Sequence, residues 1–155
     1  MISNRKFSWA FLEILKQCIR RQYPRQGIDP LALAEALAGD NQARFGDGFT
    51  ICPVKRSRLN VDSGTDYDSY IASVHGYEWR FGRYPTTEEF LAWIVMAFSE
   101  LSVSGSYVGG WWHEGKFILD VSRLINGKDA AHKFALNNRQ NYIYHPATKT
   151  EIRVL

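Results

Sequence analysis

The feature that most constrains the fold is an alternation of apolar with other residues on both sides of His113-Glu114-Gly115. Side chains along a β-strand face opposite sides with a period of two, so an alternating run predicts a strand with one buried face. A tight turn between two such runs predicts that the strands pair as an antiparallel hairpin. The sequence therefore predicts a β-hairpin over residues 109–122, and with it a β-sheet.

A second strong pattern predicts a buried helix over Thr86–Leu101. The segment Thr86-Thr87-Glu88-Glu89 is a capping box, in which the Thr86 hydroxyl accepts from the Glu89 amide and the Glu89 carboxylate accepts from the Thr86 amide. The run Phe90–Phe98 that follows leaves almost no polar face. Because a helix that is apolar on most sides is usually buried, we expect this helix to lie at the centre of the protein.

The N-terminal part of the chain predicts a helical hairpin. Apolar residues at helical spacing indicate an amphipathic helix with a basic outer face over Phe7–Tyr23. Asp29-Pro30 suits the N-cap and the first position of a second helix, Leu31–Ala38, because proline lacks the amide that a first turn leaves unpaired. Gly39 suits the end of that helix.

Shorter patterns predict the remaining elements. Gly48–Cys52, stopped by a proline, indicates a strand, and Tyr70–His75 indicates its partner. We expect the aromatic and cationic segment Tyr77–Tyr84 to be a loop that crosses the sheet. Downstream, the sequence predicts a helix followed by a pair of strands, at Lys128–Asn137, Tyr142–Tyr144 and Glu151–Val154.

These elements together predict an α+β fold, with an antiparallel sheet of about six strands packed on the central helix. We expect a single domain over residues 1–155, with the helical hairpin at 1–46 and the α+β core at 47–155. A chain of 155 residues is long enough to bury a core without disulfide or metal staples. Cys18 and Cys52 are expected to be free thiols packed in that core.

The sequence also bears on location and on cofactors. The run Phe90–Phe98 is far shorter than the roughly 20 residues that a membrane helix needs. The N-terminus lacks an apolar signal core, so we expect a cytoplasmic protein that does not bind a membrane. No nucleotide-binding loop or nucleophile elbow occurs, and zinc-ligand spacing is missing among His75, His113, His132 and His145. We therefore expect neither a cofactor nor a metal.

Positive charge is concentrated near the N-terminus. Residues 1–62 hold ten Lys or Arg against six Asp or Glu, whereas residues 63–155 hold nine against ten. Such clusters either contact phosphates or an acidic protein surface, or form a solvated face. A second candidate surface is the segment Tyr77–Arg83, which is rich in Tyr, Trp and Arg, the residue types that dominate interface hot spots. The candidate binding residues are Arg20, Arg21, Arg25, Lys55, Arg56, Arg58, Tyr77, Trp79, Arg80 and Arg83.

Two groups of residues have the types that acid–base chemistry needs. His75 and Glu78 could exchange protons as in a metal-independent nuclease, with Arg80 steadying a phosphate. His113-Glu114 offers the same residue types at the hairpin turn, where a solvated turn is the simpler interpretation. The first group defines an alternative catalytic site, and the second is expected to be structural.

The predicted hairpin carries three further features. Asp120 lies within an apolar strand, so it is either catalytic or held by hydrogen bonds from Ser122, Trp111 or backbone amides. Gly109-Gly110 presents no side chain and so allows another element to approach closely. Trp111 and Trp112 should point to opposite faces, so at most one is expected in the core, and the other is either exposed or covered by the N-terminal helices.

Several motifs follow one another along residues 48–155. They are Gly48-Phe49-Thr50, Tyr107-Val108-Gly109-Gly110-Trp111, Leu119-Asp120-Val121-Ser122 and Asn138-Arg139-Gln140-Asn141-Tyr142-Ile143-Tyr144. Their order resembles that of small accessory domains borne by phages and plasmids. The resemblance implies an accessory role in a mobile element and no particular reaction. Where such domains follow the first strand with a short turn, this chain has the long basic segment Pro53–Thr65.

From this resemblance and the uneven charge we expect a non-enzymatic protein that binds a host protein or ribonucleoprotein surface. Its concrete form would be inhibition of a nucleic-acid-targeting defence complex, an anti-CRISPR-like role. One alternative is a small metal-independent nuclease-like enzyme that uses His75, Glu78 and Arg80. Another is a protein that binds nucleic acid directly through the basic residues named above. The sequence leaves the partner and the oligomeric state open.

Overall fold

The computed structural model describes residues 27–59 and 67–155 of the chain. Over these residues the fold is α+β, which confirms the predicted fold class. The described helices are α2 (Pro30–Ala38), α3 (Asn41–Arg44), α4 (Thr87–Leu101) and α5 (Lys128–Asn137). The strands are β1 (Phe49–Ile51), β2 (Ser69–Ser73), β3 (Trp79–Phe81), β4 (Ser106–His113), β5 (Lys116–Asn126), β6 (Tyr142–His145) and β7 (Thr150–Arg153).

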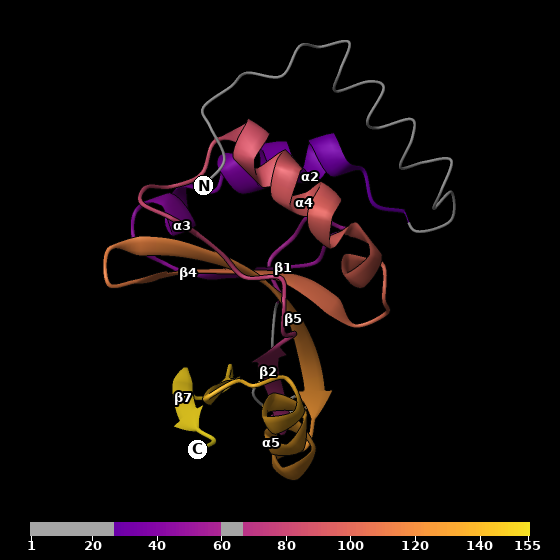
Figure 1. Ribbon diagram of the computed structural model, residues 1–155, viewed down its shortest axis with the longest axis vertical. Helices are drawn as coiled ribbons and strands as arrows, with labels where there is room; N and C mark the ends of the chain where they lie inside the picture. The colour runs from indigo at the N-terminus through magenta and orange to yellow at the C-terminus, as the bar shows by residue number, and fades with distance from the viewer. Residues whose placement is uncertain (1–26, 60–66) are drawn as a thin grey trace.

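The strands form one seven-stranded antiparallel sheet in the order β1-β4-β5-β2-β6-β7, with β3 also paired to β5. The strand β5 is eleven residues long and connects the two ends of the molecule. β4 pairs with it along one side, while β3 and then β2 pair with it along the other. In Figure 1, β5 runs from the hairpin with β4 down past β2 to α5.

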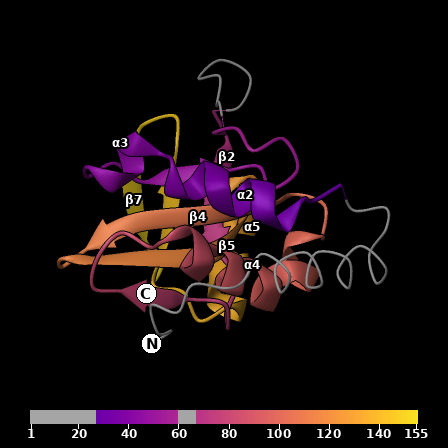
Figure 2. The same ribbon diagram turned by 90° about the horizontal axis from the view of Figure 1, so that it is seen from above.

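Two hydrophobic clusters lie along this sheet. The larger one fills the space between α2, α4 and the sheet, and its fully buried side chains include Leu37, Trp93 and Phe117. The smaller one lies under α5 and contains Tyr70 and Ile143. Figure 2, which views the molecule from above, shows α2 and α4 side by side over the strands.

The predicted helix signals act as expected. The Asp29 side chain accepts from the Ala32 amide at the start of α2. Both halves of the capping box are formed at α4: the Glu89 amide donates to the Thr86 hydroxyl at 3.3 Å, and the Thr86 amide donates to the Glu89 carboxylate at 3.1 Å. Together these bonds satisfy two backbone donors of the first turn, which has no earlier carbonyls to bond.

The hairpin of β4 and β5 is also confirmed. Its turn residues Glu114 and Gly115 have φ of 50° and 77°, the left-handed values that a tight two-residue hairpin turn requires. Glycine adopts such values without strain, which explains the placement of Gly115. The second predicted strand pair is confirmed as β6 and β7, and α5 has the predicted bounds.

Two strand predictions are wrong. β1 pairs with β4, not with the Tyr70–His75 strand, which becomes β2 and pairs with β5 and β6. The physical reason lies at Gly110, which faces Phe49 in the ladder, because a Cβ there would stand 2.5 Å from the Phe49 ring. The segment Tyr77–Tyr84 is not only a loop, since its central residues form β3 along β5.

Some predictions concern residues outside those described. The helix predicted over Phe7–Tyr23 lies outside the described residues. This helix includes Cys18 and is the first half of the predicted helical hairpin. Cys52 carries a free thiol that is half-buried at the end of β1. Among residues 27–59 and 67–155, no helix is both long and apolar enough to cross a membrane.

Candidate functional site

The predicted basic residues that the structure describes do not share one role. Arg20, Arg21 and Arg25 lie outside the described residues. Lys55 and Arg56 are exposed in the turn that follows β1. Arg58 instead has a structural role: its guanidinium lies 2.7 Å from the Asp40 carboxylate and donates to the Gly48 carbonyl at 2.8 Å.

The aromatic part of the predicted binding stretch faces the core. Tyr77 and Trp79 are partly buried and pack against the larger hydrophobic cluster. The Tyr77 carbonyl accepts from the Trp93 indole at 2.8 Å, which ties this segment to α4. Arg83 lies 2.6 Å from the buried carboxylate of Glu89. These contacts hold β3 and its flanks onto α4, so the aromatic rings of the predicted stretch are partly buried, whereas Arg80 and Arg83 are exposed.

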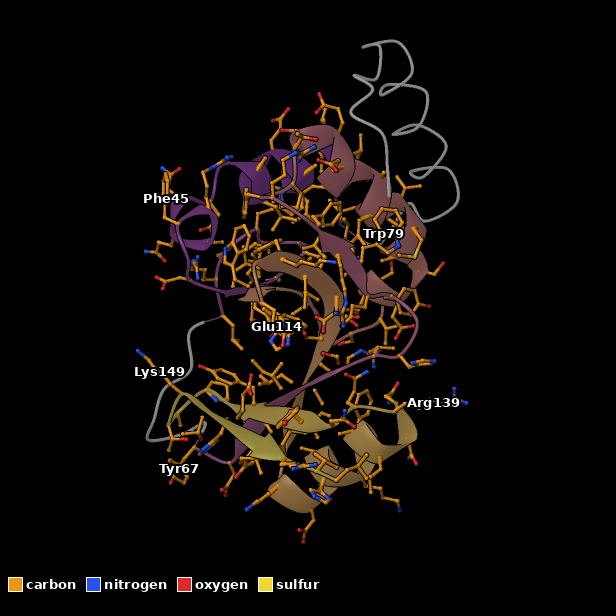
Figure 3. The ribbon with its side chains drawn as sticks, turned by 60° about the vertical axis from the view of Figure 1, so that its left-hand side comes forward. Phe45, Tyr67, Trp79, Glu114, Arg139 and Lys149 are labelled. Carbon is orange, nitrogen blue, oxygen red and sulfur yellow. The ribbon has the colours of Figure 1, made fainter. Side chains whose placement is uncertain are left out.

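The residues of the alternative catalytic site are all exposed. The Arg80 guanidinium pairs with the Glu78 carboxylate at 3.1 Å. The His75 backbone amide donates to the Asn138 side chain at 3.1 Å. At the hairpin tip, the His113 ring lies 3.7 Å from the Glu114 carboxylate and both side chains are exposed. Figure 3 shows Glu114 at the end of the β4–β5 hairpin.

Asp120 lies in a small polar site within the sheet. Its carboxylate is 2% exposed and accepts hydrogen bonds from Ser73 on β2 and from Ser122, the latter at 2.8 Å. Gly109 stands opposite Asp120 in the β4–β5 ladder. A Cβ at Gly109 would overlap both the Asp120 carboxylate and the Ser122 hydroxyl, so the missing side chain makes the room that this site occupies.

Burial changes the acidity of this carboxyl group. Loss of hydration raises the pKa of Asp120 to about 6, because the charged form is favoured by water. The hydrogen bonds from Ser73 and Ser122 lower the pKa but only partly offset the burial, and the charge of Glu78 raises it further. Asp120 can therefore take up a proton near neutral pH, although the enclosed carboxylate offers no opening for a large substrate.

The two tryptophans of β4 have different surroundings. Trp112 packs against the larger cluster, and its indole donates to the Ala43 carbonyl of α3 at 2.7 Å. Ala43 lies in α3, beyond the predicted second helix Leu31–Ala38, so this short helix covers Trp112. Trp111 points to the other face of the sheet and is half-buried there.

A group of cations that the sequence reasoning missed lies at the other end of the molecule. Residues 123–155, here called the C-terminal lobe, hold six Lys or Arg against two Asp or Glu. One of the six, Arg123, pairs with Glu100. The other five are exposed, and none forms an ion pair with another described residue: Lys128, Lys133, Arg139, Lys149 and Arg153.

Exposed tyrosines accompany these cations. Tyr142 and Tyr144 alternate on the outer face of β6 and are 50% and 36% exposed. Arg153 lies directly opposite Tyr142 in the β6–β7 ladder. Figure 3 shows Arg139 and Lys149 at opposite sides of the lobe. A charge count over a shorter window, together with the alternation in Tyr142-Ile143-Tyr144, could have found this lobe from sequence.

The chain was compared with known protein families, curated proteins and solved structures. No protein-family model, no curated protein and no solved structure matches this chain.

Two hollows of the described surface lie away from the predicted catalytic residues. One, of about 500 Å³, lies between the end of α2 and the start of α4 and is lined by Arg44, Arg83 and Tyr84 among others. Another, of about 290 Å³, lies between Cys52–Val54 and the segment Leu101–Tyr107. No three or more His, Cys, Asp or Glu residues gather as a metal site within the described ranges.

Proposed function

We propose that this protein is a non-enzymatic binding protein whose partner presents a polyanionic surface, as a ribonucleoprotein does. The observation that carries the proposal is the set of five exposed cations of the C-terminal lobe that form no ion pair with described residues. A cation already paired with a carboxylate must give up that partner to bind a phosphate. Unpaired cations bind phosphate without that cost and release counterions as they do so.

The tyrosines of the lobe favour nucleic acid as the polyanion. Exposed aromatic rings on a strand offer surfaces on which unpaired bases can stack. Such stacking tolerates any base sequence, because every base has a π-face. Tyr142 and Tyr144 project from the same face of β6, two residues apart. On an extended strand this spacing corresponds to about 6–7 Å. The lobe thus carries both stacking positions and exposed cations, with Arg153 directly opposite Tyr142.

A catalytic role for His75, Glu78 and Arg80 has less support than a binding role for the C-terminal lobe. In the alternative catalytic site, Glu78 is paired with Arg80, the residue that would steady the phosphate. The pairing partly neutralises both groups on an exposed surface.

The proposal includes the role that the resemblance implies. A mobile-element protein that occupies the nucleic-acid-binding surface of a host defence complex, or the nucleic acid held there, would use a basic lobe of this kind. The lobe would then act stoichiometrically, with one protein molecule blocking one complex.

Nucleic-acid binding can be measured by fluorescence anisotropy with labelled single-stranded RNA and DNA over a range of salt concentrations. We expect binding at low salt, with log K falling by about 0.7 per phosphate contacted for each unit of log salt. The variant Lys133→Gln/Arg139→Gln should reduce that slope by about 1–2, because it removes up to two phosphate contacts.

The matched control is Lys55→Gln/Arg56→Gln, which also removes one lysine and one arginine, from an exposed turn outside the lobe. We expect it to leave the slope nearly unchanged. Absence of binding at low salt, or an equal loss in the control, would contradict the assignment to the lobe. Cleavage of the labelled RNA that stops on His75→Ala would instead support the enzyme.

A further inference from the structure

The strand β7 leaves one side of the sheet open. It is the last strand of the order, and among the described residues only β6 pairs with it. Figure 1 shows β7 at the outer edge of the lower half of the molecule. The other terminal strand, β1, is covered by its own chain, because the Leu59 amide donates to the Thr50 carbonyl at 2.7 Å and Arg58 bridges to Ile51.

The hydrogen-bond pattern shows which backbone groups of β7 point outward. In an antiparallel pair, successive residues alternate between bonding the neighbour strand and pointing away from it. The Val154 amide donates to the Asn141 carbonyl at 2.7 Å, so Val154 and Ile152 bond toward β6. The amides and carbonyls of Glu151 and Arg153 therefore point to the open side.

We propose that β7 pairs antiparallel with β7 of a second copy of this chain, about a twofold axis through Ile152. This register places Glu151 opposite Arg153 of the second copy, and Arg153 opposite the second Glu151. The outward backbone groups of the same residues would exchange the ladder hydrogen bonds. Opposite charges would thus meet at both ends of the shared strand pair, since directly opposite side chains face the same side of a sheet.

The neighbouring registers are disfavoured by charge. The outward amides and carbonyls of the two β7 strands can still bond each other if one strand slides by two residues along the other, in either direction. One such shift places Glu151 opposite its own copy, and the other places Arg153 opposite its own copy. Like charges directly opposite each other destabilise a strand pair. Only the register centred on Ile152 is self-complementary in both backbone and charge.

The surfaces beside the strand suit such a pairing. Ile152 and Val154 are partly buried against the cluster under α5, and Ile152 would meet its copy at the axis. On the other face, Tyr142 and Tyr144 lie next to Arg153 and Glu151 in the ladder. The pair of β7 strands would join two sheets into one continuous sheet and place two basic lobes side by side. An unpaired edge strand favours association because its free amides and carbonyls can bond a strand of another chain.

The test is sedimentation velocity of the full chain over a wide range of concentration at low salt. We expect the native protein to dimerise, and Glu151→Lys or Arg153→Glu to weaken the dimer about tenfold each, because each creates two like-charge pairs. An equimolar mixture of the two variants should restore the native affinity, since the mixed pair has opposite charges at both positions. The variants Glu78→Lys and Arg80→Glu, which change an exposed ion pair away from β7, serve as matched controls and should dimerise normally.

A native protein that stays monomeric at the highest concentration would overturn the proposal. A mixture that associates no better than either single variant would overturn the register. The inference is separate from nucleic-acid binding, because the variants Lys133→Gln and Arg139→Gln lie outside β7 and should leave the dimer intact. A native protein that dimerises but gives no anisotropy signal with RNA or DNA at low salt would thus count against the proposed function alone.

Discussion

Asp120 behaves differently from a free aspartate side chain because it is buried. Its carboxyl group is enclosed by the sheet, with hydroxyl donors on two sides and no cation among its hydrogen-bond partners. Because burial favours the neutral form, the folded protein holds the Asp120 proton more tightly than the unfolded chain does. This residue therefore couples stability to pH.

The direction of that coupling follows from the raised pKa. Asp120 has a pKa of about 6 in the folded protein against an ordinary value of 3.8. Its protonation therefore contributes stability that is fully present below about pH 4 and is lost as the pH rises through about 6. The difference between the two pKa values corresponds to about 3 kcal/mol.

Asp120→Asn is expected to remove this dependence, because an amide stays neutral and can still bond both serine hydroxyls. Urea unfolding at several pH values from 4 to 7 measures the effect. Relative to the native protein, the variant should gain about 3 kcal/mol in free energy of unfolding across that range. Ser122→Ala is the control, since it removes one bond to the carboxylate and should move the transition to higher pH. If the difference in free energy of unfolding between the native protein and Asp120→Asn stayed constant with pH, Asp120 would not have a raised pKa in the folded protein.

At the scale of elements, α4 organises the larger cluster. Its capping box fixes where the helix begins, and its apolar side chains contact both α2 and the strands. Trp93 adds a polar anchor by donating to the Tyr77 carbonyl, which positions the start of β3. The helix thus determines where the neighbouring strand lies, as well as burying apolar area.

Ile94→Ala should lower the free energy of unfolding by about 2–5 kcal/mol, because Ile94 is fully buried and the smaller side chain leaves a cavity. Met96→Ala on the same helix is the matched control, because Met96 is 38% exposed and its removal leaves little cavity. Chemical denaturation of the two variants gives the comparison. Equal midpoints for Ile94→Ala and the native protein would show that α4 is not the core helix.

At the scale of the whole molecule, two hydrophobic clusters share one strand. The first half of β5 contributes Phe117, Leu119 and Val121 to the larger cluster, and Ile125 near its end packs against the smaller one. Loss of either cluster frees part of the same strand and removes ladder bonds from the other. We therefore expect the two halves to unfold together.

Ile143→Ala tests this expectation, because Ile143 is buried in the smaller cluster whereas Trp79, Trp93 and Trp112 lie in or against the larger one. The change should destabilise the protein by about 2–5 kcal/mol. Tryptophan fluorescence and far-ultraviolet circular dichroism should report the same lowered midpoint. An unchanged fluorescence midpoint beside an early dichroism transition would mean that the C-terminal lobe unfolds by itself.

Local signals explain which parts of this structure could be predicted from sequence. The capping box of α4, the Asp29-Pro30 start of α2, the bounds of α5 and the β4–β5 turn all depend on residues within a few positions of one another. Side-chain periodicity and capping are properties of such short segments. The α+β class followed from these elements together.

Only the tertiary structure decided the strand order and the use of the polar side chains. β1 pairs with β4 because Gly110 admits Phe49, a contact between residues about sixty positions apart. Arg58 is bound by Asp40, and Tyr77 and Trp79 pack inward, whereas five of the six cations of the C-terminal lobe form no ion pair with described residues. Whether a charge or a ring is available to a partner depends on distant neighbours that no local pattern specifies. The chain therefore determined its elements by itself, and the packing of those elements determined which surface is left to bind.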